Sequence, residues 1–129
     1  MPRIDAIATV VEDMELTLGF YRLLGFDIPV DADDEGYVVI DLGCGLRFAW
    51  NTEEVERSFN PEWQAPPIAG RMGITFRCES ASEVDAAYSE IVRAGYDGGL
   101  APFDAPWGSR HCRVLDPDGN AIDLFAPLP

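Results

Sequence analysis

Aromatic, acidic and cationic side chains gather at two places in the second half of the chain. Phe103, Asp104 and Trp107 fall in a proline-rich stretch, and Arg110 follows three residues later. Asp123 lies in the apolar run of residues 121–126. Aromatic rings stack on planar or cationic ligands, and carboxylates pair with ligand cations. These residues therefore predict a site that binds a small molecule.

The first half adds three candidates of the same kinds. Trp50 is expected at the end of a strand and Trp63 in a long connector. Two interpretations of the tryptophans stay open: burial of loops against the sheets, and stacking on a ligand. Arg47 and Arg110 also have two interpretations. They can pair with Asp123 or another carboxylate of the site, which we favour, or they can bind an anionic group of a ligand.

Few residues of the sequence could carry out covalent or metal chemistry. His111 is the single histidine, and a lone histidine in a strand is more often a packed or surface residue than a ligand. Cys44, Cys78 and Cys112 are widely spaced and form no C-x-x-C pair, so neither a zinc knuckle nor a disulfide framework is expected. Asp123 could serve as a general base if a substrate proton lay within reach. A structural ion pair with an arginine is the favoured role.

The composition is that of one small globular domain. The chain has 129 residues, of which 47% are hydrophobic and 25% charged. Its net charge of −14 disfavours nucleic acid and anionic membrane surfaces and favours a cationic ligand, although such a charge also serves solubility. No apolar run approaches the roughly 18 residues of a membrane span, and the first eight residues lack the pattern of a secretory signal. We expect a cytoplasmic protein, which the cysteine usage also fits.

A pattern of strand, helix and strands positions the candidates of the first half. Residues 4–11 are typical of a strand, Asp13 of a helix N-cap, and Gly25 of the C-terminal cap of a helix of about three turns. Residues 51–70 carry three prolines and no clear period, which indicates a connector. Short strands are predicted at residues 26–30, 37–42 and 46–50.

The same pattern returns about 70 residues later. Residues 72–78 are strand-like, Ser80 and Glu83 have the spacing of a capping box, and Gly95 ends the second helix. Residues 116–120 (DPDGN) have the chemistry of a hairpin turn. Further strands are predicted near residues 100–103, 110–115 and 121–126.

The duplication predicts an α+β fold. Each half must cover the apolar face of its sheet, so two tandem β-α-β-β-β modules are expected to form curved mixed sheets around a cleft. We predict a single domain over residues 1–129. Its parts are a first module at about 1–51, a connector at about 52–70 and a second module at about 71–129.

Four short strings, two in each half, make the chain resemble the vicinal-oxygen-chelate superfamily, which includes glyoxalase I, the extradiol dioxygenases and the bleomycin-resistance proteins. In the first half they are VEDM at residues 11–14 and FYRLLGF at residues 20–26. In the second half they are PWGSR at residues 106–110 and DPDGN at residues 116–120. The resemblance covers nearly the whole chain and implies the two-module fold.

Enzymes of that family bind a divalent metal through four His, Glu or Gln side chains, one from the first and one from the last strand of each half. The metal acts as a Lewis acid on a substrate that chelates it with two oxygens. By resemblance these positions correspond to Ala6, Arg47, Gly73 and Asp123. Only Asp123 offers an oxygen, and Arg47 would repel a cation. The resemblance therefore implies no metal site and no cofactor here.

We thus expect a metal-independent small-molecule-binding protein rather than an enzyme. The chain is most similar in character to the bleomycin-resistance branch, whose members are small acidic homodimers that bind cationic, planar antibiotics. The resemblance implies a homodimer and the sequestration of a cationic or aromatic antibiotic-like ligand. Two alternatives stay open: a glyoxalase- or dioxygenase-like lyase or isomerase with a remodelled active site, and a regulatory module whose ligand orders a partner interface.

Overall fold

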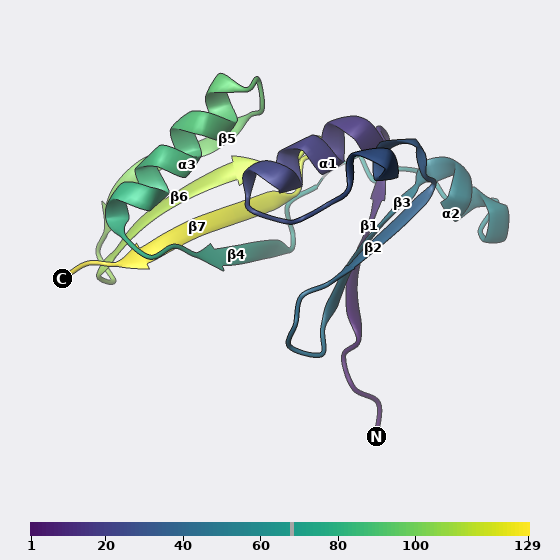
Figure 1. The fold of residues 1–129 in the computed structure, drawn as a ribbon, viewed down its shortest axis with the longest axis horizontal. Helices are drawn as coiled ribbons and strands as arrows, with labels where there is room; N and C mark the ends of the chain where they lie inside the picture. The colour runs from purple at the N-terminus through teal and green to yellow at the C-terminus, as the bar shows by residue number, and fades with distance from the viewer. Residues whose placement is uncertain (68) are drawn as a thin grey trace. The chain divides into compact units, whose positions relative to one another are not determined.

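Two compact units make up the chain in the computed structural model, which describes residues 1–67 and 69–129 (Figure 1). The first unit comprises Met1–Arg22 and Phe26–Ala65, and the second comprises Leu23–Gly25 and Pro66–Pro129. The described residues form three α-helices and two mixed sheets of three and four strands, so the predicted α+β class is confirmed. None of these helices has both the length and the apolar character needed to cross a membrane.

The sheet of the first unit has the strand order β1-β3-β2, with β1 parallel and β2 antiparallel to β3. The Asp13 carboxylate caps the first helix by accepting a hydrogen bond from Leu16 N at 3.0 Å, as its position predicted. Gly25 follows the helix with φ of +98°, the left-handed conformation that favours glycine. The elements are β1 (Ala6–Val11), α1 (Met14–Leu23), a 3-10 helix (Val30–Asp34), β2 (Tyr37–Asp41), β3 (Arg47–Thr52) and α2 (Glu53–Phe59).

The first unit differs from the prediction in two elements. The strand predicted at residues 26–30 is absent, and the Arg22 guanidinium donates hydrogen bonds to the carbonyls of Ile28 and Pro29, at 3.0 and 2.8 Å. The prediction of an irregular connector was wrong at α2. This helix begins at the cap Thr52, whose hydroxyl accepts a hydrogen bond from a backbone N–H three residues on, at 3.2 Å. The first module is therefore β-α-β-β.

An aromatic cluster forms the core of the first unit. Phe48 and Trp50 lie on one side of β3 because alternate residues of a strand share a face, and their ring centroids are 4.7 Å apart. Tyr21 of α1 contacts both rings at 5.2 and 5.3 Å, and Phe26 lies within 6.1 Å of them. Trp50 and Tyr21 are fully buried. These contacts hold α1 against that side of the sheet.

The second unit carries a four-stranded sheet of order β4-β7-β6-β5, in which only β4 and β7 are parallel. Ser80 caps α3 as predicted, since its Oγ accepts from Glu83 N at 3.2 Å. The second half of the capping box differs: the Glu83 carboxylate accepts from Glu79 N at 2.7 Å, one residue before the N–H of Ser80. The Asp116 carboxylate closes the predicted hairpin turn by accepting from two backbone N–H groups and the Asn120 amide. The elements are β4 (Gly73–Arg77), α3 (Ala81–Arg93), β5 (Gly98–Ala105), β6 (Ser109–Leu115) and β7 (Ala121–Pro127).

Helix α3 covers one side of this sheet, along which it lies in Figure 1. The even-numbered residues of β6 and β7 face it because a strand alternates its side chains. The odd-numbered residues of these two strands face away from α3. The core between helix and sheet consists of Cys78, Val84, Cys112, Leu124 and Ala126, with Leu24, Phe76, Ala87 and Tyr88 packed against it.

Candidate functional site

The side of the second sheet that faces away from α3 carries polar and aromatic side chains, and we call it the open face. The strand pairing shows which residues share this face. Asp123 of β7 lies between Thr75 of β4 and Arg113 of β6. Arg77 lies beside Phe125, and His111 lies beside Phe103. No helix of the second unit packs on this side among the described residues. The side chains of the open face that matter below are Thr75, Arg77, Phe103, His111, Arg113, Asp123 and Phe125.

Three aromatic rings meet at one end of the open face. Phe103 of β5 and His111 of β6 pair across the strands, with centroids 5.9 Å apart. Trp107, in the turn between these strands, approaches His111 at 5.7 Å and Phe103 at 6.3 Å, with its ring nearly perpendicular to both. Trp107 is 67% exposed, whereas His111 and Phe103 are half-buried. A planar molecule can therefore stack on the face of one of these rings and meet the others at an angle.

An ion-pair network lies beside the aromatic rings. The Arg113 guanidinium donates to both oxygens of Asp123, through Nε to Oδ1 at 2.6 Å and through Nη2 to Oδ2 at 3.1 Å. His111 Nε2 lies 3.0 Å from Asp123 Oδ2 and donates to it, since a carboxylate only accepts. The side chains of Asp123 and His111 are 16% and 15% exposed, and that of Arg113 is 41% exposed. Asp123 is thus the fixed centre of the network.

These contacts set the ionisation of Asp123. Burial by itself would raise the pKa of its carboxyl, but the hydrogen bonds and charges of Arg113 and His111 outweigh burial and lower the pKa below its ordinary value. The pKa of Arg113 is raised because Asp123 accepts its hydrogen bonds. Asp123 is therefore an ionised carboxylate at neutral pH whose oxygens are already bound, which makes it a poor general base.

Three predicted site residues come together here: Phe103, Trp107 and Asp123. Two others lie on the opposite side of the same sheet. Arg110 donates to Asp85 of α3 at 2.9 and 3.3 Å and to Asp104 at 3.1 Å. Arg110 thus pairs with carboxylates, but Asp123 is not among them and these partners lie away from the open face. Arg110 and Asp104 face away from the ring cluster and join helix α3 to the edge of the sheet.

The remaining predicted residues belong to the first unit. Arg47 forms an ion pair with Asp5. Trp63 receives the Arg57 guanidinium over its ring, at 5.2 Å from the centroid. Trp50 is fully buried in the aromatic core beneath α1, so its ring is closed to a ligand and we remove it from the candidate set.

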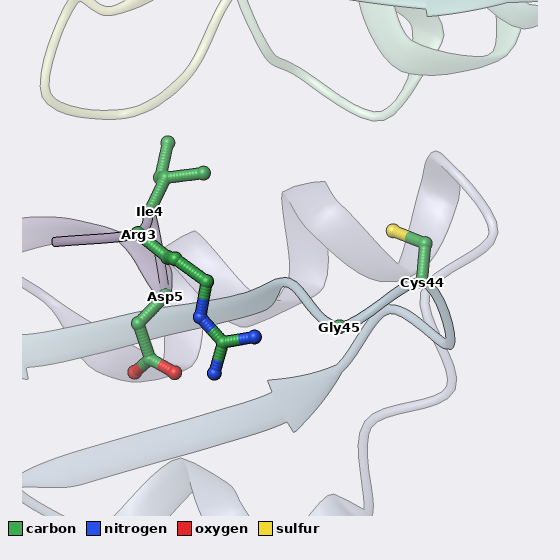
Figure 2. A pocket seen from close by; sticks show the side chains of 5 residues that line it. All are labelled: Arg3, Ile4, Asp5, Cys44 and Gly45. Carbon is green, nitrogen blue, oxygen red and sulfur yellow. The ribbon is translucent and has the colours of Figure 1, made fainter. Parts of the chain in front are cut away.

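A hollow of about 670 Å³ lies where β1 begins, beside the turn between β2 and β3. Figure 2 shows its five lining residues, among them the charged side chains of Arg3 and Asp5 and the thiol of Cys44. All five are exposed, and none is aromatic. The hollow therefore lacks both the rings and the half-buried ion pair of the open face, and it is the weaker candidate.

Comparisons with known proteins agree with this fold. The model of the Glyoxalase/Bleomycin resistance protein/Dioxygenase superfamily matches residues 3–124. The chain belongs to this superfamily. The resemblance to the vicinal-oxygen-chelate group, based on two strings in each half of the chain, is thereby confirmed. No curated protein matches the chain.

Solved structures of the superfamily share the fold at low sequence identity. A glyoxalase/bleomycin resistance protein/dioxygenase family enzyme from Burkholderia phytofirmans has a TM-score of 0.80 at 17% identity, covering 96% of this chain and 98% of that one. A glyoxalase-related enzyme from Fulvimarina pelagi has a TM-score of 0.77 at 18% identity, covering 98% and 88%. A protein of unknown function from Agrobacterium tumefaciens has a TM-score of 0.73 at 26% identity, covering 99% and 96%.

The strand registers correct one of the four positions assigned to the superfamily's metal. In the second unit Asp123 lies two residues beyond the partner of Gly73 in β7. In the first unit the partner of Ala6 is Arg47, and the residue two further along β3 is Ala49. The equivalent of Asp123 in the first unit is therefore Ala49 rather than Arg47.

The residues at these positions do not fit a divalent metal ion. Two alanines and one glycine offer no side-chain donor, and the oxygens of Asp123 already accept three hydrogen bonds. Within residues 1–67 and 69–129, no group of three or more His, Cys, Asp or Glu side chains could hold a metal ion. We therefore assign none of the superfamily's metal chemistry to this chain.

Proposed function

We propose that this chain is a metal-independent small-molecule-binding protein whose ligand stacks on the aromatic rings of the open face. The observation that carries the proposal is the ring cluster itself. Trp107 is 67% exposed and lies beside Phe103 and His111, so aromatic surface from three side chains is gathered in one exposed place. A planar ligand would bury this surface and so gain hydrophobic free energy.

Binding is favoured over turnover because the acidic group of the open face is already engaged. The carboxylate of Asp123 is held by Arg113 and His111, and its pKa is lowered below the ordinary value. The four metal positions hold one carboxylate between them. These facts support sequestration of an aromatic, antibiotic-like molecule, the kind of activity that the name of the bleomycin-resistance proteins implies.

A homodimer is part of this proposal, carried over from the superfamily. Light scattering of the purified chain at micromolar concentration is expected to give twice the mass of 14.2 kDa. A mass equal to that of one chain would remove this part and leave the ligand site unaffected.

A tryptophan-fluorescence screen in the presence of EDTA tests the proposal. We expect aromatic compounds that change the emission of the wild-type protein and lose this effect in Trp107→Phe. Trp63→Phe is the matched control, since Trp63 also lies in a loop but belongs to the first unit. The proposal fails if EDTA abolishes binding, if both variants respond alike, or if a broad set of aromatic compounds leaves the emission unchanged.

A further inference from the structure

We propose that the ligand of the open face is a planar aromatic acid, whose ring lies against Trp107, Phe103 and His111 and whose carboxylate is bound by the Arg113 guanidinium. The inference rests on the proposed function and adds the chemical class of the ligand. It reverses the expectation from net charge, which favoured a cation.

The first observation is the local charge of the open face. On the four strands, its charged side chains are Arg77, Arg113 and Asp123, which sum to +1 when His111 is neutral. The whole chain carries −14. The Debye length at physiological ionic strength is only about 8 Å, so a ligand in contact with this face responds mainly to the charges beside it.

The second observation is the hydrogen-bonding capacity that Arg113 keeps. A guanidinium has five N–H donors, and Asp123 accepts from one on Nε and one on Nη2. The other three have no partner among the described residues, and the side chain is 41% exposed. Asp123 thus fixes the plane of the guanidinium while leaving donors for a second carboxylate, the geometry that arginine binds best.

Glycine at position 99 contributes to this arrangement. A Cβ atom there would lie 2.9 Å from Cγ of Arg113, so the arginine stem occupies the space that a side chain at Gly99 would fill. The Arg113 side chain is therefore positioned at two places: Gly99 leaves room for its stem, and Asp123 binds its guanidinium.

Spacing along β6 matches an aromatic acid. His111 and Arg113 are two residues apart on the same side of the strand, about 7 Å at the rise of a β-strand. In an aromatic acid, the distance from the ring centre through the carboxylate to a hydrogen-bond donor is comparable, since the hydrogen bond itself adds about 2.9 Å. One molecule can therefore contact the ring cluster and the guanidinium together.

A cationic ligand would find no partner of its own. Asp123 is the only carboxylate that the described strands present on the open face, and its oxygens are bound by Arg113 and His111. Arg77, whose guanidinium lies over the Phe125 ring at 5.8 Å from the centroid, adds a second positive charge. A cation could stack on Trp107 but would be repelled by both guanidinium groups.

Three probes of one ring system test the inference by isothermal titration calorimetry in EDTA: 1-naphthoate, 1-naphthalenemethanol and 1-naphthalenemethylamine. We expect the acid to bind at least tenfold more tightly than the alcohol, and the alcohol more tightly than the amine. If acid and alcohol bind equally, or the amine binds most tightly, the inference is overturned while the proposed function stands. If none of the three binds, the inference fails, and the proposed function fails with it if the broad fluorescence screen is also negative.

Two variants locate the acid group. Arg113→Lys keeps the charge but loses the planar fork, and should weaken binding of the acid about tenfold while leaving the alcohol unchanged. Arg77→Gln leaves the hydrogen bonds of Asp123 intact and should weaken binding of the acid about threefold. It therefore tests the effect of positive charge even if Arg113→Lys folds poorly. Arg57→Lys, the guanidinium over Trp63, is the matched control and should change nothing. Unchanged affinity of the acid in both open-face variants would overturn the inference.

Discussion

Replacement of Asp123 by asparagine removes the charge at the centre of the ion-pair network while keeping the shape of the side chain. Opposite unit charges about 4 Å apart near a protein surface attract by about 4 kcal/mol. Desolvation of a carboxylate that is only 16% exposed, and solvent screening of Arg113, which is 41% exposed, offset about half of this attraction. We therefore expect Asp123→Asn to lower the free energy of unfolding by about 2 kcal/mol at pH 7.

Urea denaturation at several pH values measures this effect. The pKa of Asp123 in the folded protein lies below the ordinary value of 3.8. Its stabilisation is therefore fully present above the pKa of the unfolded chain and is lost as the pH falls through the lower, folded pKa. The difference between wild type and Asp123→Asn should therefore shrink as the pH falls below about 4.

The pair of Arg57 and Glu53, whose side chains are 45% and 27% exposed, is the matched control. Its atoms lie 3.5 Å apart one helical turn from each other, and Glu53→Gln should cost at most about 0.5 kcal/mol. Equal effects of Glu53→Gln and Asp123→Asn would refute the reasoning, as would a difference for Asp123→Asn that does not depend on pH. Either result would mean that the network adds no more than a surface ion pair.

The burial of individual side chains sets three further expected outcomes. Iodoacetamide should label Cys44 in the native protein, but Cys78 and Cys112 only in denaturant. Both of these thiols are buried, and burial raises the pKa of Cys112 to about 12. Rapid labelling of Cys112 in the native protein, measured by mass spectrometry, would contradict its buried position. Leu124→Ala should lower the free energy of unfolding, measured with urea, by about 2–4 kcal/mol, because the Leu124 side chain is only 2% exposed beneath α3. A loss of less than about 1 kcal/mol would argue against this core. Iodide should quench Trp107 strongly, so Trp107→Phe should remove most of the quenchable emission; unchanged quenching would place the exposed indole elsewhere.

Much of the second unit could be predicted because its signals are local. The Ser80 cap of α3 and the turn at residues 116–120 act within a few residues, and both form as predicted. The partner of Asp123 was also readable from the sequence, although we did not predict it. Leu115 and Ala121 are the paired residues on either side of this turn. Two residues further from the turn on each strand, Arg113 pairs with Asp123.

The first unit shows where local signals fall short. Trp50 alternates with Ala49 and Asn51 along β3, so it must share a side with Phe48, but which side α1 covers is decided by tertiary packing. The helix α2 was hidden because its cap, Thr52, is also the last residue of a strand. The absent strand at residues 26–30 reflects a long-range choice, since a side chain of α1 donates to two backbone carbonyls in that segment.

A two-dimensional ¹H–¹⁵N NMR titration with 1-naphthoate in EDTA is the most direct test of ligand binding on the open face. It follows the backbone amides, the tryptophan indole N–H groups and the arginine Nε–H groups. We predict saturable shifts at Trp107, His111 and Arg113, with the indoles of Trp50 and Trp63 unchanged. Shifts confined to the first unit, for example around the hollow lined by Arg3 and Cys44 (Figure 2), would contradict the placement of the ligand on the open face.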